Sequence, residues 1–379
     1  LAFTTAIQGM KWETSPASTE LEDRMMEWMG DAIGIPKDWC GVIQDTASTA
    51  TLVSILTARE KKTNFQINEK GFYDTPKFRL YCSDQTHSSI EKGAKIAGLG
   101  KENVIKIPTD DLMALRPDLL EKQIQEDIEN GFEPLCIVVA LGTTGTMAMD
   151  PLDEIGDIAQ KYKIWLHVDA AQAGTGLLLP EYQYLMKGIE KADTFTFNPH
   201  KWMGVNFDCC AYWAKDENAL VNTFAILPEY LKTKTDGLVN NHCDWGIQLG
   251  RRFRSLKLWF VMRYYGLEGL QNRIRNHIKI AEKLEEQIKQ SPDFEFVIPR
   301  SMNLNCFRYK PTGIDDLEEL NRKNEQLLHK LNATGKIFLT HTKVNGIYTL
   351  RMVTGQTNVE WSHVEKAWDL IRKTALKMV

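Results

Sequence analysis

The chain has 379 residues, which is enough for two domains with a large buried core. Its 46 basic and 50 acidic residues give a net charge of −4, so charge offers no basis for binding nucleic acid or an anionic membrane. The seven cysteines are scattered without paired spacing, which argues against a disulfide scaffold or a zinc site and favours a reducing, cytoplasmic compartment.

Apolar strands alternate with amphipathic helices between about residue 40 and residue 215 of the sequence. The expected strands are 79–83, 103–107, 135–141, 164–168, 194–197 and 209–213, and the expected helices are 88–99, 117–130 and 152–162. Near-continuous apolar strands separated by helices indicate a mostly parallel sheet that is covered on both faces. The longest apolar run, 135–141, is too short to cross a bilayer.

The pattern changes after about residue 216. Residues 217–245 show no clean periodicity, and long connections of this kind are often active-site lids. Beyond them we expect helices and short strands in alternation, namely helices at 250–265 and 267–290 and strands at 294–298, 303–309, 337–340 and 348–352. We therefore predict a large domain over residues 1–256 and a smaller α+β domain over residues 257–379.

Two charged side chains follow buried strands. Lys201 comes after the strand 194–197, and Asp169 follows the strand 164–168. Ligands bind beyond the carboxyl ends of parallel strands, so both side chains are expected at that edge of the sheet. A lysine in such a place is commonly only solvated, and a buried aspartate can serve a salt bridge or a helix cap. The same two groups are also what pyridoxal 5′-phosphate (PLP) chemistry needs, an amine for the aldehyde and a carboxylate for the pyridine nitrogen.

Further polar residues are expected at the same edge. His87 lies between the strand 79–83 and a helix, and Thr144 follows the strand 135–141 in a glycine turn. Residues 44–49 precede a strong helical run at 50–59. The free N–H groups of a helix N-terminus can bind an anion, but Ser and Thr serve there equally well as N-caps, and the residues alone leave both readings open.

The segments 194–202, 165–171, 83–89 and 248–255 together resemble the group II PLP-dependent decarboxylases, and among them the aromatic L-amino-acid decarboxylases. The resemblance extends over essentially the whole chain. It implies the type I fold of PLP-dependent transferases, with a mostly parallel seven-stranded sheet and a smaller C-terminal α+β domain. It also implies a homodimer with active sites at the subunit interface. We expect the family's N-terminal flap to be missing or truncated in the chain as given.

The resemblance also implies roles for individual residues. Lys201 would hold the cofactor covalently as an aldimine, and Asp169 would pair with the pyridinium nitrogen. His87 would stack on the cofactor ring and meet the substrate carboxylate. The remaining cofactor contacts implied are Ala47, Ser48, Thr144, Ala171 and Asn198.

Substrate and reaction are implied by four more positions. Tyr230, in the long connection, matches a tyrosine that donates a proton to the substrate-derived carbon in related decarboxylases, which favours plain decarboxylation over oxidative aldehyde formation. His200 favours an aromatic substrate and is counted among the catalytic residues. Gly250 matches a position where a small residue enlarges the pocket. Met10 lies in a segment that lines the partner subunit's pocket.

The leading hypothesis is a cytoplasmic, homodimeric PLP enzyme that decarboxylates tryptophan, DOPA, tyrosine or phenylalanine. Two alternatives remain: an aldehyde synthase or aminotransferase on the same fold, and a catalytically silent PLP-binding dimer. No metal motif is found in the sequence. The basic run 251–254 could suggest a nucleic-acid patch, but the helix that follows it is apolar and the chain is acidic overall.

Overall fold

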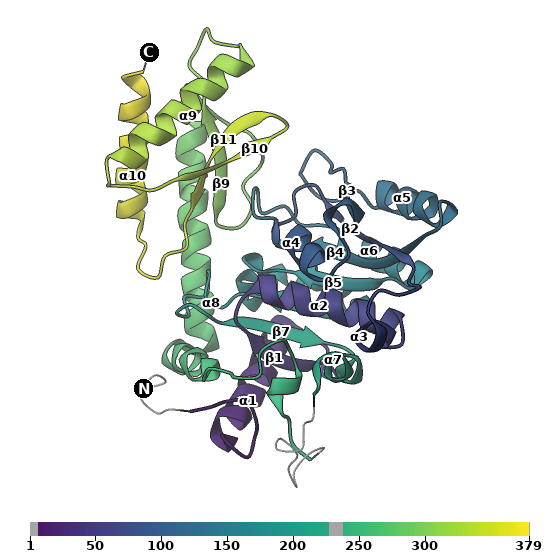
Figure 1. The fold of residues 1–379 in the computed structure, drawn as a ribbon. Helices are drawn as coiled ribbons and strands as arrows, with labels where there is room; N and C mark the ends of the chain where they lie inside the picture. Colours follow the sequence, from purple (N-terminus) through teal and green to yellow (C-terminus); the bar gives the residue numbers. More distant parts are fainter. Residues whose placement is uncertain (1–6, 227–237, 379) are drawn as a thin grey trace. The chain divides into compact units, whose positions relative to one another are not determined.

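The computed structural model describes residues 7–226 and 238–378, which form two compact units (Figure 1). The first unit runs to residue 110 and includes 114–142 and 149–270. The second contains 111–113, 143–148 and the chain from residue 271 onward. The predicted domain boundary between residues 256 and 257 stays a prediction.

The first unit is built on a seven-stranded sheet in the order β1-β7-β6-β5-β4-β2-β3. Its strands are β1 (Cys40–Gln44), β2 (Lys77–Ser83), β3 (Val104–Ile107), β4 (Phe132–Ala140), β5 (Trp165–Asp169), β6 (Thr194–Phe197) and β7 (Cys210–Ala214). Neighbouring strands from β6 to β3 are parallel, whereas β7 is antiparallel to both β6 and β1. This architecture confirms the predicted fold class.

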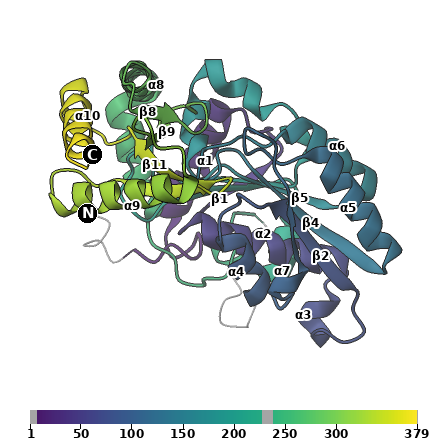
Figure 2. The same ribbon diagram turned by 90° about the horizontal axis from the view of Figure 1, so that it is seen from above.

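Helices cover both faces of this sheet, as its apolar strands require. Figure 2 shows α2, α4 and α7 on one side and α5 and α6 on the other. The α-helices of the unit are α1 (Pro16–Ile33), α2 (Ala47–Lys62), α3 (Gln66–Lys70), α4 (Ser89–Ile96), α5 (Pro117–Glu129), α6 (Leu152–Tyr162) and α7 (Glu217–Phe224). Short 3-10 helices are η1 (Lys101–Asn103), η2 (Ala173–Leu178), η3 (Pro180–Met186), η4 (Ile189–Lys191) and η6 (His242–Asp244).

A buried chain of polar side chains joins α2 to the central strands. The His167 ring contacts Thr51 Oγ1 through Nε2 at 3.3 Å and Thr194 Oγ1 through Nδ1 at 2.9 Å. Ser54 Oγ lies 2.7 Å from Thr194 Oγ1 and accepts a hydrogen bond from Trp165 Nε1 at 2.9 Å. Because buried polar groups must be paired, this network fixes the position of α2 against the strands that lead to Asp169 and Lys201.

Burial lowers the pKa of His167 to about 3, so its imidazole is neutral in the folded chain at neutral pH. The unfolded chain takes up this proton near pH 6.5, and stability is therefore lost as the pH falls from 6.5 toward 3. We expect His167→Asn to reduce the pH dependence of the unfolding free energy in this window by up to about 1.4 kcal/mol per pH unit. Urea unfolding at several pH values, compared with an exposed-histidine control such as His329→Asn, tests this. Parallel pH profiles of parent and His167→Asn would contradict it.

The second unit contains a four-stranded antiparallel sheet in the order β10-β11-β9-β8. Its elements are β8 (Phe294–Phe296), β9 (Leu304–Tyr309), α9 (Leu317–Ala333), β10 (Thr340–Val344), β11 (Ile347–Val353), α10 (Trp361–Leu376) and the C-terminal part of α8 (Arg254–Lys289). In its core, Trp368 packs edge-on against Phe294 and Phe307, with ring centroids 4.8 and 5.8 Å away. The predicted smaller α+β region is thus present.

Several predicted elements need correction. The stretch 217–245 is not without periodic structure, because α7 begins in it where Asp216 accepts a hydrogen bond from the Ala219 N–H at 2.9 Å. The strand predicted at 337–340 lies instead at Thr340–Val344, and β1 was not identified. By contrast, the two helices predicted at 250–265 and 267–290 are observed as the two helical parts of α8, which are separated by a kink at Gly266 with φ 65° and ψ 173°. Only glycine adopts this backbone conformation readily.

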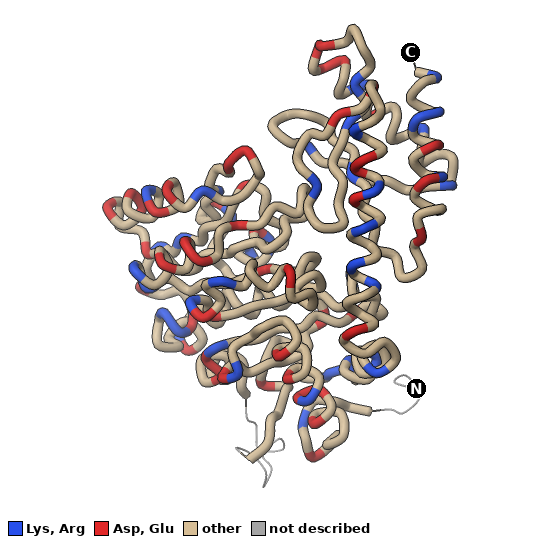
Figure 3. Tube along the Cα trace, turned by 180° about the vertical axis from the view of Figure 1, so that it is seen from behind, with Lys and Arg blue, Asp and Glu red and all other residues tan. Residues whose placement is uncertain are grey.

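All seven cysteines are free thiols, and six of them are buried. Figure 3 shows acidic and basic residues interspersed along the chain. Among the described residues, no helix is both long and apolar enough to span a bilayer. Within the same residues, no group of three or more His, Cys, Asp or Glu side chains is arranged to hold a metal ion.

Candidate active site

Three of the predicted site residues follow parallel strands of the first unit. Asp169 is the last residue of β5, Lys201 follows β6, and His87 follows β2. Parallel strands present their carboxyl ends at the same edge of a sheet. The three groups are close enough to act on one another, since Asp169 and Lys201 both affect the pKa of His87 and Lys201 affects that of Asp169. The structure therefore brings these three residues together.

Asp169 is 7% exposed, and its Oδ1 accepts a hydrogen bond from the Ala171 N–H at 2.9 Å. Burial raises the pKa of this carboxyl, while the Ala171 N–H and the charges of Lys201 and His87 oppose the effect. No ion pair to Asp169 is found among residues 7–226 and 238–378. A buried carboxylate without a direct cationic partner fits a site for a protonated ring nitrogen, because that cation would offset its desolvation.

His87 is held in one tautomer by the start of α4. Its Nδ1 accepts a hydrogen bond from the Ser89 N–H at 3.1 Å and lies 2.9 Å from Ser89 Oγ. The neutral ring therefore carries its proton on Nε2. Partial burial lowers the pKa of His87; Asp169 opposes this, and Lys201 and Lys92 reinforce it. A neutral, oriented imidazole is suited to stacking on a flat aromatic group, which stays a prediction for this residue.

The turn that carries Lys201 is tied to the end of β5. The Lys201 N–H donates to the Asn198 carbonyl at 2.9 Å, and the Asn198 N–H donates to the Ala171 carbonyl at 3.1 Å. Asn198 is 3% exposed, and its Oδ1 has no hydrogen-bond partner within residues 7–226 and 238–378. A buried polar atom without a partner marks a place where a polar ligand group is needed. The cofactor contacts expected of Ala171 and Asn198 stay predictions.

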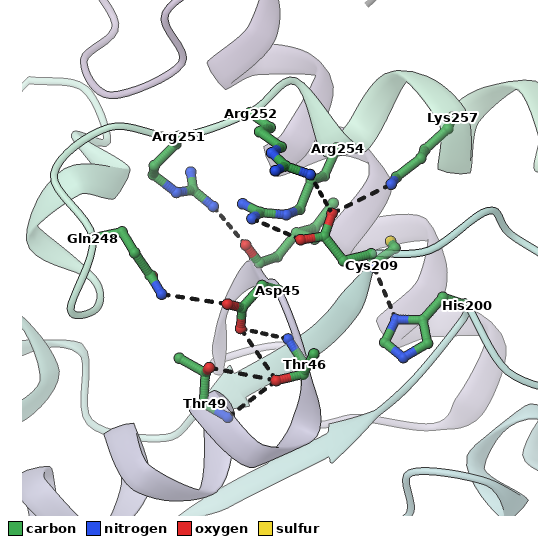
Figure 4. A network of polar contacts seen from close by, with 12 residues as sticks. Asp45, Thr46, Thr49, His200, Cys209, Gln248, Arg251, Arg252, Arg254 and Lys257 are labelled. Carbon is green, nitrogen blue, oxygen red and sulfur yellow. Dashed lines mark hydrogen bonds and ion pairs between the residues drawn. The ribbon is translucent and has the colours of Figure 1, made fainter.

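The N-terminus of α2 is both capped and open to an anion. Thr46 Oγ1 accepts the Thr49 N–H at 3.4 Å as an N-cap, and the Asp45 carboxylate accepts the Thr46 N–H at 2.6 Å (Figure 4). The N–H groups of Ala47 and Ser48 have no hydrogen-bond acceptor among the described residues. The N-cap and the anion site that the sequence left as alternatives are thus compatible, and these two N–H groups could hold a phosphate.

Asp45 places a negative charge beside this proposed phosphate position. Like charges repel by about 1 kcal/mol at short range even in a well-solvated setting. We expect Asp45→Asn to tighten PLP binding by roughly fivefold, which is that energy as an equilibrium ratio, while the amide still accepts the Thr46 N–H. The dissociation constant, from absorbance titration of cofactor-free protein, is the measurement. Asp38→Asn, an exposed acid before β1, is the control, and unchanged or weaker PLP binding by Asp45→Asn would contradict the expectation.

His200 lies next to the basic run that the sequence left unexplained. Its Nδ1 accepts the Cys209 N–H at 2.9 Å, its ring meets the Phe207 ring edge-on at 4.7 Å, and burial lowers its pKa. It is within electrostatic range of Lys201, so it adjoins the site. Its catalytic role stays a prediction.

The basic residues form ion pairs with an acidic residue of the same chain (Figure 4). Arg252, Arg254 and Lys257 all approach Asp208, at 3.6, 3.1 and 3.5 Å. Burial alone would raise the pKa of Asp208, but the hydrogen bond and charge of Arg254, with Lys257, lower it overall. The sequence analysis did not predict this cluster. The i, i+3 spacing of Arg254 and Lys257 indicated that both side chains lie on one face of a helix, where they can share a partner.

The remaining predicted residues are placed as follows. Thr144 belongs to the second unit, where Arg351 donates to the Thr144 and Gly145 carbonyls, both at 2.6 Å. Tyr230 lies outside the described residues. Gly250 is exposed, a Cβ added there would meet nothing within 4 Å, and its place at the substrate pocket stays a prediction. The segment of Met10 is held by its carbonyl, which accepts the Cys243 N–H at 3.0 Å.

A doubly covered parallel sheet with a lysine, a buried aspartate and a histidine at its carboxyl edge defines a PLP-dependent enzyme. Residues 1–310 match the family described as the pyridoxal-dependent decarboxylase conserved domain. The chain is 42% identical to phenylacetaldehyde synthase of Arabidopsis thaliana, over 97% of this chain and 76% of that protein. It is also 42% identical to tyrosine decarboxylase 2 of the same plant, over 98% of this chain and 69% of that protein.

Solved structures agree with the sequence relatives. The structure of Oryza sativa TDC with PLP and tryptamine superimposes with a TM-score of 0.96 and 34% identity, covering all of this chain and 80% of that one. The chain therefore belongs to the pyridoxal-dependent decarboxylase family, and its cofactor is pyridoxal 5′-phosphate. The buried Asn198 Oδ1, the Asp169 carboxylate and the open N–H groups of α2 are consistent with that cofactor.

Proposed function

We propose that the protein is a carboxy-lyase that converts an aromatic L-amino acid, one of tryptophan, DOPA, tyrosine or phenylalanine, to the corresponding amine and CO2. The observation that carries this proposal is the arrangement of His87, Asp169 and Lys201 at the carboxyl ends of the parallel strands β2, β5 and β6. A tyrosine decarboxylase is 42% identical to the chain, which supports an aromatic amino acid as the substrate.

Each of the three residues has a distinct task in this proposal. PLP, when bound, supplies an electron sink for the pair of electrons left when CO2 departs. Lys201 would hold the cofactor through its side-chain amine. Asp169 would keep the ring nitrogen protonated. A buried carboxylate is costly unless a cation lies beside it, and the protonated nitrogen would be that cation. His87 offers its flat ring for stacking and its Nε2–H to the substrate carboxylate.

The reaction consumes one proton, since the carboxylate leaves as CO2 and a hydrogen takes its place on the α-carbon. We assign delivery of that proton to Tyr230. His200, which precedes Lys201 in the chain, belongs to the proposed catalytic set. The active form in the proposal is a cytoplasmic homodimer in which Met10 contributes to the partner's pocket.

An aldehyde synthase is the second candidate, because a phenylacetaldehyde synthase is as similar to the chain as the tyrosine decarboxylase. That reaction takes up O2 and water and releases the aldehyde, CO2, ammonia and hydrogen peroxide. Purified protein incubated with PLP and each of the four amino acids distinguishes the two candidates. Amine without peroxide supports the decarboxylase, and aldehyde with equimolar peroxide supports the synthase. A keto acid in place of both products would indicate an aminotransferase, and no product from any amino acid would favour a catalytically silent PLP-binding dimer.

A further inference from the structure

A buried ion pair lies close to Gly250 in the first unit. Arg251 Nη2 donates to Glu22 Oε1 of α1 at 2.6 Å, with the two side chains only 7% and 2% exposed. Burial alone would raise the pKa of Glu22, but the charges of Arg251 and His242 and the hydrogen bonds to its carboxylate lower it overall. The pair is therefore ionised. Removal of either side chain would leave a buried charge without a partner and would strongly destabilise the fold.

The pair also clamps the end of strand β1. Glu22 Oε1 accepts the Ile43 N–H at 2.8 Å, and Arg251 Nη2 donates to the Ile43 carbonyl at 2.7 Å. Both backbone polar groups of Ile43 are thus bonded to the two side chains of the pair. Two residues further along the chain is Asp45, which leads into the N-terminus of α2. The pair is consequently linked to the proposed phosphate position through a short, extended piece of backbone.

The main chain of Arg251 holds the segment that carries Met10. The Gly9 N–H donates to the Arg251 carbonyl at 3.1 Å. Gly9 also packs closely on α1, where an added Cβ would lie 3.0 Å from Ser18 Oγ. On the other side, the Met10 carbonyl accepts the Cys243 N–H at 3.0 Å. Residues 9–10 and 243–251 are therefore joined to each other, and Arg251 joins both to α1 and β1.

We propose that Glu22 and Arg251 are positioning residues for substrate selection, which rests on the proposed function. Their buried pair fixes the two segments that carry Met10 and Gly250, the residues assigned to the walls of the substrate pockets. Both hydrogen bonds come from Nη2, whose two N–H groups are fixed in the plane of the guanidinium and donate to Glu22 and to the Ile43 carbonyl. A lysine keeps the charge, but its ammonium rotates freely and does not hold its N–H groups in that fixed pair of directions.

The test compares Arg251→Lys with Arg24→Lys in the full chain loaded with PLP. Arg24 is the matched control, because it pairs with Glu27 on the same helix at 2.7 Å but both side chains are about 60% exposed. The measurements are kcat and KM for tryptophan and phenylalanine and hydrogen exchange of the Gly9 and Cys243 amides. Arg251→Lys is expected to change the tryptophan-to-phenylalanine ratio of kcat/KM by roughly five- to tenfold and to speed exchange at both amides, whereas Arg24→Lys changes neither.

An unchanged substrate ratio in an active Arg251→Lys protein would overturn the inference, and so would unchanged exchange at Gly9 and Cys243. If Arg251→Lys does not fold, Glu22→Asp is tested by the same measurements, because it shortens the side chain but keeps its charge. The expected changes in substrate ratio and amide exchange are the same, and their absence would overturn the inference. Failure of the proposed function gives a different result, since the parent protein itself would then release no amine from any of tryptophan, DOPA, tyrosine or phenylalanine, whereas failure of the inference alone leaves the parent protein active.

Discussion

Lys201→Ala is expected to remove the visible absorbance of the covalently bound cofactor and to lower the turnover rate by roughly 10⁴-fold or more, as loss of a covalent catalytic group does. The side chain is exposed, so the fold should be unaffected. Absorbance spectra, borohydride reduction followed by mass spectrometry of the peptides, and thermal unfolding provide the measurements.

The control for this substitution is Lys187→Ala. Lys187 is 79% exposed and pairs with Asp153 of α6 at 2.8 Å. This variant should keep the absorbance, the reducible adduct and the turnover of the parent. A reducible covalent adduct that persists in Lys201→Ala would show that another lysine carries the cofactor, and the assignment of the site would then be wrong.

Asp169→Asn is expected to lower kcat on the order of 10²- to 10³-fold, the usual effect of removing one preorganised electrostatic partner of the reacting group. The substitution retains an oxygen for the Ala171 N–H, so PLP affinity should change far less than kcat. The change acts on the protonation of the ring nitrogen and not on the covalent attachment at Lys201. Single-turnover rates and PLP titration measure the two effects separately.

Asp193→Asn is a matched control for this experiment. Asp193 also accepts a backbone N–H, that of Leu166 at 2.8 Å, and burial likewise raises the pKa of its carboxyl. It precedes β6, however, and so lies at the amino end of the parallel strands, away from Lys201. The control is expected to affect stability but not kcat. Equal turnover by Asp169→Asn and the parent would exclude the proposed pairing of Asp169 with the cofactor.

The carboxyl edge of the sheet could be predicted from sequence because the apolar strands leading to it are continuous and buried. Strand 135–141, for example, is observed as β4 at Phe132–Ala140. The placement of His87, Asp169 and Lys201 followed from the rule for parallel strands. The strand β10 was misplaced because its residues are largely polar and exposed, so the apolar run at 337–339 gave the stronger signal.

Other features of the site could not be predicted, because they depend on contacts between distant residues. Glu22 and Arg251 are 229 positions apart, and no local pattern connects them. The two readings of residues 44–49 could not be separated by sequence either, since a threonine N-cap and open N–H groups occur together in the structure. The roles of Tyr230, His200, Thr144 and the substrate-contacting residues stay predictions.

The free thiols have a consequence for the chemistry of the protein. Burial raises the pKa of every one of the seven, to about 12 for Cys40, Cys209 and Cys306 and about 11 for Cys243. The thiolate is the form that reacts with oxidants and alkylating agents, so almost none of it exists in the folded chain. Air oxidation of the native protein is therefore slow, and chemical modification of a thiol reports transient opening of the structure around it. Modification of Cys82, Cys136 or Cys210 would report opening of the seven-stranded sheet, and modification of Cys306 opening of the second unit.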